Sequence, residues 1–254
     1  MTSAPPPAPD PTLSLDDLHD AWPSLEPEER WQGFRLLGRV DAETCFLGLP
    51  ARDQAMLMQR LPVDERRSWL RLLTPDDAAD LVQRLPAEEH AFLLGLLDGP
   101  MRTEVQALLA HAEDEAGGLM NPHFVRVRPE MLVDEAIGYI RKQARERMAT
   151  IYYVYVLDPE QRLLGAVSLR ELFTSAASTT VQELMRTDIE RLTETTDQEE
   201  IARLFARHDL LAMPVVDAAG RMVGIVTVDD VVDVVNEAAT EDIQKMGGGD
   251  DRHR

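Results

Sequence analysis

Leucine recurs at every twelfth position through the first half of this chain. The series is Leu25, Leu37, Leu49, Leu61, Leu73, Leu85, Leu97 and Leu109. Several of these leucines are followed by proline and then by acidic residues, as in residues 61–65 (Leu-Pro-Val-Asp-Glu) and 85–89 (Leu-Pro-Ala-Glu-Glu). Proline stops one helix, and acidic side chains in the next turn suit the positive N-terminal end of another. The repeat therefore predicts a succession of short helices separated by tight corners.

A second apolar position accompanies the repeat. Eight residues after a series leucine a bulky apolar side chain often returns: Leu57, Trp69, Leu81, Leu93 and Val105. Twelve residues hold a helix of about two and a half turns plus a corner. Such a helix cannot bury its apolar stripe alone, so neighbouring helices must stack into a solenoid. We expect an all-α superhelical solenoid over residues 13–112, preceded by a disordered leader over residues 1–12.

The charge balance restricts the partners of the chain. Its 254 residues carry 46 Asp and Glu against 26 Lys and Arg, a formal net charge of −20. We therefore do not expect binding to nucleic acid or to an anionic membrane through bulk electrostatics, and cations are the natural counterpart. The alternative is that the surplus carboxylates only keep the protein soluble.

Hydropathy and cysteine content indicate a soluble, reduced protein. The longest apolar run, residues 151–157, has seven residues, whereas a membrane-spanning helix needs about twenty. We therefore expect no direct membrane insertion and a cytoplasmic location. The single cysteine, Cys45, cannot form an internal disulfide, and its apolar neighbours Phe46 and Leu47 favour a buried thiol over a reactive one.

A longer repeat, of about sixty to sixty-five residues, occupies the second half. Residues 119–120 (Leu-Met) match 184–185, residues 154–158 match 213–217, and residues 163–172 match 222–231. Each copy is interpreted as a short strand, an amphipathic helix, a buried strand, a turn, a second strand and a second helix. The continuous apolar runs 154–157 and 212–216 are typical of strands covered on both faces.

A hydroxyl residue marks the start of the last helix in each copy. Ser168 and Thr227 are good N-caps, and the acidic Glu171 and Asp230 lie three residues later, a spacing typical of a capping box. A duplicated β-α-β-β-α unit with Gly-x-Val-Ser/Thr-x-x-Asp/Glu after its second strand resembles the tandem CBS-domain pair. We therefore expect an α+β CBS pair, with domain 1 at residues 113–178 and domain 2 at residues 179–237.

The combination of the two halves narrows the resemblance. A leucine–proline superhelix, the joint 116–120 (Ala-Gly-Gly-Leu-Met), a CBS pair and the segments 209–217 and 237–243 together resemble the cytosolic half of the MgtE magnesium transport proteins. The resemblance implies an MgtE-type transmembrane domain as partner, which this sequence does not contain. It also implies that residues 238–254 hold the start of a connecting helix and a flexible tail.

The resemblance places magnesium contacts on acidic residues of both halves. Matched motif to motif, these are Asp76, Asp80, Asp197, Asp209, Asp230 and Asp233, with Asp77 beside them. It further implies backbone oxygens near Gly118 and Ala206, and Glu241 or Asp242 after the CBS pair. Where a further acid is expected in the closing segment the sequence has Ala238. Magnesium takes oxygen ligands and keeps several waters, which suits loose carboxylate clusters.

Each of these acids also has a purely structural interpretation. Asp76, Asp77 and Asp197 lie at expected helix starts, where carboxylates complement the helix dipole. Asp230 is a suitable cap partner for Thr227. The spacing alone does not separate these alternatives from metal binding.

The same resemblance implies an adenine nucleotide, ATP above all, between the two CBS copies. The residues that occupy the corresponding positions are Tyr153, Ser168, Arg170, Glu171, Thr227 and Asp230. Arg170 would pair with phosphate and Tyr153 would flank the adenine ring. The alternative is that the hydroxyl residues are only caps and that Tyr153 is core.

No pattern of the sequence predicts an enzyme. The six histidines show no paired metal spacing, and the glycines 247–249 lack the lysine of a phosphate-binding loop. Two functions remain. One is a magnesium sensor that closes its domains on Mg²⁺ and restricts ion flux through a pore. The other is a free-standing nucleotide-binding CBS module that uses the solenoid to dock on a partner protein. In either case a homodimer through the CBS domains is expected.

Overall fold

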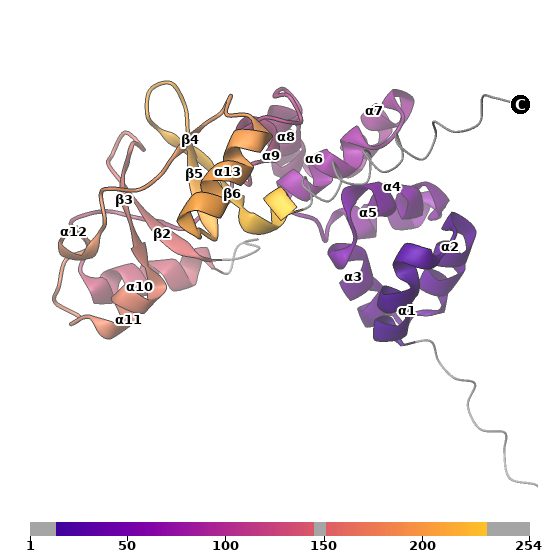
Figure 1. The fold of residues 1–254 in the computed structure, drawn as a ribbon, viewed down its shortest axis with the longest axis horizontal. Helices are drawn as coiled ribbons and strands as arrows, with labels where there is room; N and C mark the ends of the chain where they lie inside the picture. Colours follow the sequence, from indigo (N-terminus) through magenta and orange to yellow (C-terminus); the bar gives the residue numbers. More distant parts are fainter. Residues whose placement is uncertain (1–13, 145–150, 233–254) are drawn as a thin grey trace, which may run out of the picture. The chain divides into compact units, whose positions relative to one another are not determined.

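The computed structural model describes residues 14–144 and 151–232 (Figure 1). These residues form two compact units. The first holds residues 14–73 and 80–97, and the second holds residues 74–79 and everything described from residue 98 onward. Each unit is described by itself.

The first half is a run of short helices. The elements are α1 (Leu15–Ala21), the 3₁₀ helix η1 (Trp22–Ser24), α2 (Pro27–Leu36), α3 (Arg39–Gly48), α4 (Ala51–Arg60), α5 (Val63–Leu70), α6 (Pro75–Gln83), α7 (Ala87–Leu96) and α8 (Gly99–Leu108). From α2 to α8 each helix begins twelve residues after the one before. The predicted helical repeat is confirmed.

The series leucines form the corners. Leu37, Leu49, Leu61 and Leu97 are extended residues that directly follow a helix. All but Leu49 of these four are buried. The residues eight positions later, Leu57, Trp69, Leu81, Leu93 and Val105, are all buried as well. The two apolar positions of the repeat therefore build the core, because a helix of two to three turns gains most of its stability from packing on its neighbours.

The second unit contains the two copies of the longer repeat. The first is α9 (Ala116–Leu119), β1 (Arg126–Val127), α10 (Val133–Gln143), β2 (Tyr153–Leu157), β3 (Leu163–Ser168) and α11 (Leu169–Thr174). The second is α12 (Val181–Leu184), β4 (Leu192–Thr193), α13 (Gln198–His208), β5 (Ala212–Val216) and β6 (Met222–Thr227), with helix again at 228–232. The predicted order of elements is confirmed in both copies.

The two copies form two sheets of the same topology. In each sheet a short first strand pairs parallel to the middle strand, which pairs antiparallel to the third. Tyr153 opposes Ser168 in the first sheet, and Ala212 opposes Thr227 in the second. The middle strands β2 and β5 are buried along almost their whole length. This burial confirms that they are covered on both faces.

Each copy lends a short segment to the sheet of the other. Asn121, just before the first copy's strands, exchanges two backbone hydrogen bonds with Ile225 on β6. Arg186, just after α12, exchanges two with Ala166 on β3. Gly224 and Gly165 allow these approaches, because a Cβ on Gly165 would lie 2.4 Å from the carbonyl oxygen of Arg186. The exchange fixes the two sheets against each other.

Membrane spanning is not supported by the described part of the chain. None of the helices within residues 14–144 and 151–232 is both long and apolar enough to cross a bilayer.

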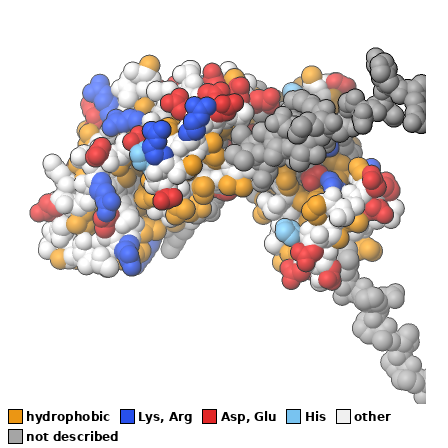
Figure 2. Space-filling model, viewed as in Figure 1, with side chains coloured by type: hydrophobic (Ala, Val, Ile, Leu, Met, Phe, Trp, Pro, Cys, Tyr) orange, Lys and Arg blue, Asp and Glu red, His pale blue; other side chains and the backbone are white. Residues whose placement is uncertain are grey.

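Acidic and basic side chains are interspersed on the visible face of the sheet-containing part (Figure 2). Although the chain has a net charge of −20, its acidic side chains do not form an unbroken acidic surface on that face.

Candidate functional site

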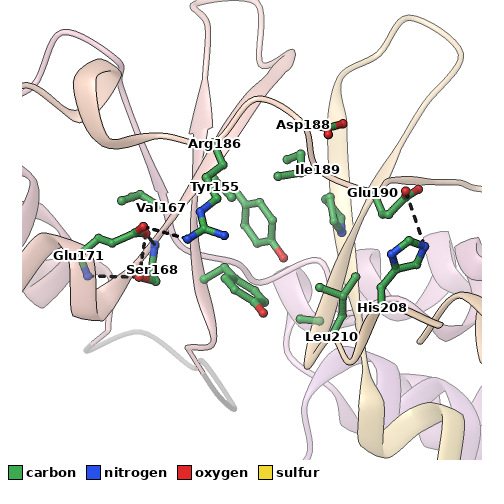
Figure 3. A pocket seen from close by; sticks show the side chains of 14 residues that line it. Tyr155, Val167, Ser168, Glu171, Arg186, Asp188, Ile189, Glu190, His208 and Leu210 are labelled. Atoms are coloured by element: carbon green, nitrogen blue, oxygen red, sulfur yellow. Dashed lines mark hydrogen bonds and ion pairs between the residues drawn. The ribbon is translucent and has the colours of Figure 1, made fainter. Parts of the chain in front are cut away.

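A cavity of about 480 Å³, here called the intersheet cavity, lies between the two copies (Figure 3). Its lining residues are Tyr153, Tyr155, Ala166, Val167, Ser168, Glu171, Arg186, Asp188, Ile189, Glu190, His208, Leu210, Ala212 and Pro214. They come from β2, β3 and α11 of the first copy, and from the segment before β4, the end of α13 and β5 of the second. The volume falls in the range of small-molecule sites.

One end of the intersheet cavity is a network around Glu171. The carboxylate of Glu171 accepts the backbone N–H of Ser168 at 3.0 Å and its hydroxyl at 2.8 Å. The hydroxyl in turn accepts the backbone N–H of Glu171, which completes the predicted capping box. Arg186 reaches the other carboxylate oxygen at 3.3 Å (Figure 3). The hydrogen bonds from Ser168, aided by the charge of Arg186, lower the pKa of Glu171.

The middle of the intersheet cavity is aromatic and apolar. The Tyr155 ring is buried, and its hydroxyl has no hydrogen-bond partner among the described residues. Burial, together with the nearby phenol of Tyr153, raises the pKa of Tyr155. Ile189, Leu210 and Pro214 supply apolar surface opposite. A flat organic group would find van der Waals contact there, and a polar atom on it would satisfy the Tyr155 hydroxyl.

The other end of the intersheet cavity is polar again. His208, the last residue of α13, lies 3.7 Å from the carboxylate of Glu190. In Figure 3 this pair and the Ser168–Glu171 pair lie at opposite ends of the cavity. Asp188 is exposed at the rim. The cavity therefore offers an arginine at one end and acceptor groups at the other, with an aromatic wall between.

The structure divides the residues expected to bind nucleotide. Tyr153, Ser168 and Glu171 line the intersheet cavity, whereas Arg170, Thr227 and Asp230 do not. Arg170 is exposed on α11. The cavity arginine is instead Arg186. No motif in the sequence marks Arg186 or the other charged and imidazole groups of the cavity, Asp188, Glu190 and His208. The longer repeat held one signal for Arg186. Because residues 184–185 match residues 119–120, the next residue, Arg186, corresponds to Asn121 of the first copy.

Thr227 and Asp230 belong to a second cluster, at the start of the helix after β6. The carboxylate of Asp230 accepts the backbone N–H of Thr227 at 2.9 Å and its hydroxyl at 2.6 Å. The first turn of α6, which belongs to the same compact unit, brings two more acids close to it. We call Asp76, Asp77, Asp229 and Asp230 the four-aspartate cluster.

The carboxylates of the four-aspartate cluster perturb one another. Burial raises the pKa of Asp230 well above its ordinary value, and the charges of Asp76 and Asp229 add to the effect. Burial also raises the pKa of Asp77, as does the charge of Asp229, against two hydrogen bonds from Thr74. Asp76 is buried as well. Negative charge is thus disfavoured here, and a cation would relieve it.

The cluster is not a preformed metal cage. Within residues 14–144 and 151–232, no three acidic, histidine or cysteine side chains converge closely enough to hold a metal ion. Direct coordination by several carboxylates at once is therefore not built in. A hydrated magnesium ion, which binds through one or two carboxylates and its own waters, fits such a loose cluster better than calcium or zinc does.

The other residues expected to contact magnesium are dispersed. Asp80 lies one turn beyond Asp76 on α6. Asp197 caps α13 through the N–H of Glu199, which agrees with its structural interpretation. Asp209 ends the same helix in the left-handed conformation, with φ 49°.

Two expected backbone ligands and three closing residues complete that set. Ala206 is exposed on α13, and Gly118 is buried in α9. A Cβ on Gly118 would lie 2.3 Å from the carbonyl oxygen of Ala112. The closing residues Asp233, Glu241 and Asp242 lie outside the described residues, as does Ala238, where the resemblance led us to expect a further acid.

Comparison with known families assigns both halves of the chain. Residues 13–114 match the MgtE intracellular N domain, and residues 116–178 and 181–237 match the CBS domain. A crystal structure of the cytosolic domain of the Mg²⁺ channel MgtE in complex with ATP superimposes with a TM-score of 0.77 and 42% identity. The match covers 87% of this chain and 90% of that one. The chain belongs to the MgtE family.

Further MgtE relatives agree. The magnesium transporter MgtE of Thermus thermophilus is 44% identical over 237 residues, which is 92% of this chain and 52% of the relative. The structure of the soluble part of a magnesium transporter has a TM-score of 0.69 at 27% identity, covering 89% of this chain and 93% of that one. This chain spans about half the length, or less, of the curated MgtE relatives it matches. The expected fold class, an all-α solenoid followed by an α+β CBS pair, is confirmed.

Proposed function

We propose that this chain is the magnesium-sensing regulatory region of an MgtE-type transporter, acting on a pore formed by a transmembrane partner domain. The four-aspartate cluster carries the proposal. Burial and the neighbouring charges of Asp76 and Asp229 disfavour the ionised forms of Asp77 and Asp230, so a divalent cation lowers the free energy of the state in which these acids lie together. Without the cation, repulsion favours separating Asp76 and Asp77 from Asp229 and Asp230.

The position of α6 explains how a separation of these acids would affect both compact units. The first residues of α6 belong to the unit that contains the CBS copies, and the residues from Asp80 onward belong to the solenoid unit. A cation that holds the first turn of α6 therefore holds a helix shared by both units. Release of that turn lets the solenoid move relative to the CBS pair, and in our proposal the closed, metal-bound arrangement restricts ion flux.

Magnesium titration tests this function. At ten times its dissociation constant, one site stabilises the native state by about 1.4 kcal/mol, which corresponds to about 3–6 °C in the melting temperature of a chain of this size. On going from chelator to millimolar Mg²⁺, we expect the melting temperature to rise. We also expect the radius of gyration from small-angle X-ray scattering to fall. Asp77→Asn combined with Asp230→Asn should abolish both responses.

Asp64→Asn is the matched control for that experiment. Asp64 occupies the same place in the first turn of α5 that Asp76 occupies in α6, one repeat earlier, but it is exposed. The control loses one carboxylate without touching the four-aspartate cluster and should respond to Mg²⁺ like the parent chain. Equal responses of all three proteins would contradict the proposal, as would no response of the parent chain.

Nucleotide binding in the intersheet cavity is a second, compatible proposal. The MgtE relative of known structure holds ATP, and the cavity described above offers an aromatic wall beside Arg186. We propose that Arg186 exchanges Glu171 for a phosphate, and that Tyr153 and Tyr155 contact the base. The exposed Arg186–Glu171 pair is worth at most about 1 kcal/mol, so the exchange costs little.

ATP binding by calorimetry tests the second proposal. Arg186→Gln should weaken binding about tenfold, since a charge-assisted contact contributes roughly 1.5 kcal/mol. Arg170→Gln removes the same charge from the neighbouring helix, outside the cavity, and should leave the affinity within about twofold. If Arg170→Gln has the larger effect, the nucleotide does not occupy this cavity.

We propose that the chain forms a homodimer through its CBS helices. The exposed apolar side chains Tyr139 on α10 and Phe173 on α11 support a homodimer through the CBS helices. We propose a regulatory rather than an enzymatic role, at the cytoplasmic side of the membrane. Sedimentation velocity of Phe173→Glu and of the parent chain tests the dimer. The substitution should dissociate it, because a symmetric apolar interface would receive the new charge twice.

A further inference from the structure

The solenoid unit contains a second cavity, of about 580 Å³, that the function proposed above does not use. It lies among α2, α3, α5 and the end of α4, and we call it the arginine–tryptophan cavity. Its lining residues are Trp31, Phe34, Arg35, Leu37, Arg39, Ala42, Arg60, Leu61, Pro62, Glu65 and Trp69. Three arginines and two tryptophans therefore face a single carboxylate, in a chain whose net charge is −20.

Two of the arginines lie over the rings of the tryptophans. The guanidinium carbon of Arg35 lies 5.7 Å from the centre of the Trp31 ring, and that of Arg39 lies 4.6 Å from the centre of the Trp69 ring. A cation–π contact of this kind restrains a guanidinium while its N–H groups stay available for other partners. Such a group is preorganised to bind a carboxylate through two hydrogen bonds.

The arginines of this cavity are only weakly committed to other partners. Arg35 has no ion pair among the described residues. Arg39 pairs with Glu43 and Arg60 pairs with Glu28, but both pairs are on the surface. Exposed pairs are worth about 0–1 kcal/mol, so an incoming carboxylate can replace Glu43 or Glu28 at little cost.

The indole N–H of Trp69 is a second, independent sign of a missing partner. Trp69 is only 3% exposed, held between the rings of Phe34 and Phe46 at 5.3 and 5.2 Å. Its N–H has no acceptor among the described residues. A buried donor without an acceptor costs about 1–3 kcal/mol. Trp69 lines the cavity, and a ligand oxygen bound beside its N–H would supply that acceptor.

Exposed aliphatic side chains follow directly on the lining arginines in the sequence. Leu36 is 72% exposed and Val40 is 75% exposed, beside Arg35 and Arg39 respectively. Val63, next to the lining residue Pro62, is 58% exposed. Each of these side chains is adjacent in sequence to a residue that lines the cavity, so exposed aliphatic surface lies near it, and such surface is typical of a protein-binding site. They extend the recognised surface beyond what a small anion would cover.

We propose that the arginine–tryptophan cavity binds an acidic segment of a partner protein that also carries leucine-like side chains. Carboxylates of the segment pair with Arg35 and Arg39, and its apolar side chains cover Trp31 and the aliphatic rim. The rest of this acidic chain repels such a segment, so the arginines determine where it binds. This proposal does not depend on magnesium sensing or on nucleotide binding.

Fluorescence anisotropy of the full chain, in chelator and without nucleotide, tests the proposal. The probe is a labelled twelve-residue peptide of glutamate and leucine arranged so that a helix has one acidic and one apolar face. We expect saturable binding that weakens with added salt. Arg35→Gln combined with Arg39→Gln should raise the dissociation constant about tenfold or more, because two charge-assisted contacts are lost.

Arg52→Gln is the control for charge, since Arg52 is exposed on α4 and does not line the cavity. It should bind the peptide like the parent chain, and thermal unfolding of all variants checks that they fold. The proposal is overturned if the peptide does not bind, if Arg52→Gln weakens binding as much as the double variant, or if a polyglutamate peptide without leucine or free citrate competes equally well. The last result would indicate a site for small anions.

Discussion

The backbones of Ala166 and Arg186 are joined in both directions: each N–H donates to the carbonyl oxygen of the other, at 3.0 and 2.9 Å. Ala166 lies on the third strand of the first sheet, and Arg186 lies at the start of the second copy. This pairing places the Arg186 side chain at the intersheet cavity, next to Glu171. The geometry of the cavity therefore depends on a contact between copies that is made by backbone atoms.

We predict that Gly165→Ala disrupts this pairing. The new Cβ would lie 2.4 Å from the carbonyl oxygen of Arg186, closer than any ordinary contact, so the strand or the segment must move. Overpacking of this kind costs about 1–3 kcal/mol. Chemical denaturation should show the loss, and ATP affinity should fall with it.

Gly138→Ala provides the contrast. Gly138 lies within α10, and a Cβ there meets nothing within 4 Å. Alanine in a helix interior is more favourable than glycine by about 1 kcal/mol. This variant should be as stable as the parent chain or more so. If both glycine variants lose stability alike, the close approach at Gly165 is not the cause.

The four-aspartate cluster predicts a pH dependence of stability. Because the pKa values of Asp77 and Asp230 are raised in the folded state, the folded protein binds more protons than the unfolded chain above the ordinary aspartate pKa of 3.8. The contribution of these groups to stability therefore falls as the pH rises from about 4 through their raised values. Thermal unfolding in chelator between pH 4 and pH 8 measures it.

The double variant Asp77→Asn with Asp230→Asn isolates this contribution. It should melt above the parent chain at pH 7 without metal, and the difference should shrink toward pH 4, where the parent carboxylates are protonated. Glu171, Glu183 and Asp217, whose pKa values are lowered, act in the opposite direction but are common to both proteins. A difference that is constant with pH would refute the assignment.

Cys45 should be unreactive in the native state. The thiol is buried in α3, and burial raises its pKa to about 11, so the thiolate is scarce at pH 8. With Ellman's reagent, the thiol of the folded protein should react slowly and incompletely. In denaturant, one equivalent of thiol per chain should react at once, since the chain has one cysteine. Fast modification of the folded protein would show that Cys45 is accessible.

The inner position of the twelve-residue repeat should dominate the stability of the solenoid. Leu57 on α4 is fully buried, so Leu57→Ala should cost about 2–5 kcal/mol. Leu47 on the preceding helix is 48% exposed, and Leu47→Ala should cost much less, about 1 kcal/mol or below. Urea unfolding of the two variants compares the same chemical change at the two depths.

The local secondary structure of the chain could be predicted from the sequence. Short-range rules account for the corners at Leu37, Leu61 and Leu97, the helix starts twelve residues apart, the capping box at Ser168 and the hydrogen bonds from Thr227 to Asp230. Proline, acidic first turns and hydroxyl caps act on backbone groups within three or four residues. Such signals are complete within a short stretch of chain.

The candidate site was readable only in part. Ser168 and Glu171 were found because their cap is local, whereas Arg186, Glu190 and His208 have no local pattern that marks them. The resemblance assigned Arg170 to the phosphate, but Arg170 does not line the cavity, because successive residues on a helix point about 100° apart and its neighbour Glu171 faces the cavity instead. Arg186 reaches the cavity only because its backbone pairs with Ala166, twenty residues earlier.

The sequence by itself therefore determined the kinds of element, their order, the repeat that each belongs to and the family. The tertiary structure alone decided which side chains meet: Arg186 with Glu171 in the intersheet cavity, and Asp77 with Asp229 between α6 and the helix after β6. The physical reason is range. Helix caps and apolar periodicity are set by neighbours along the chain, while a site is assembled by packing that brings distant backbones together.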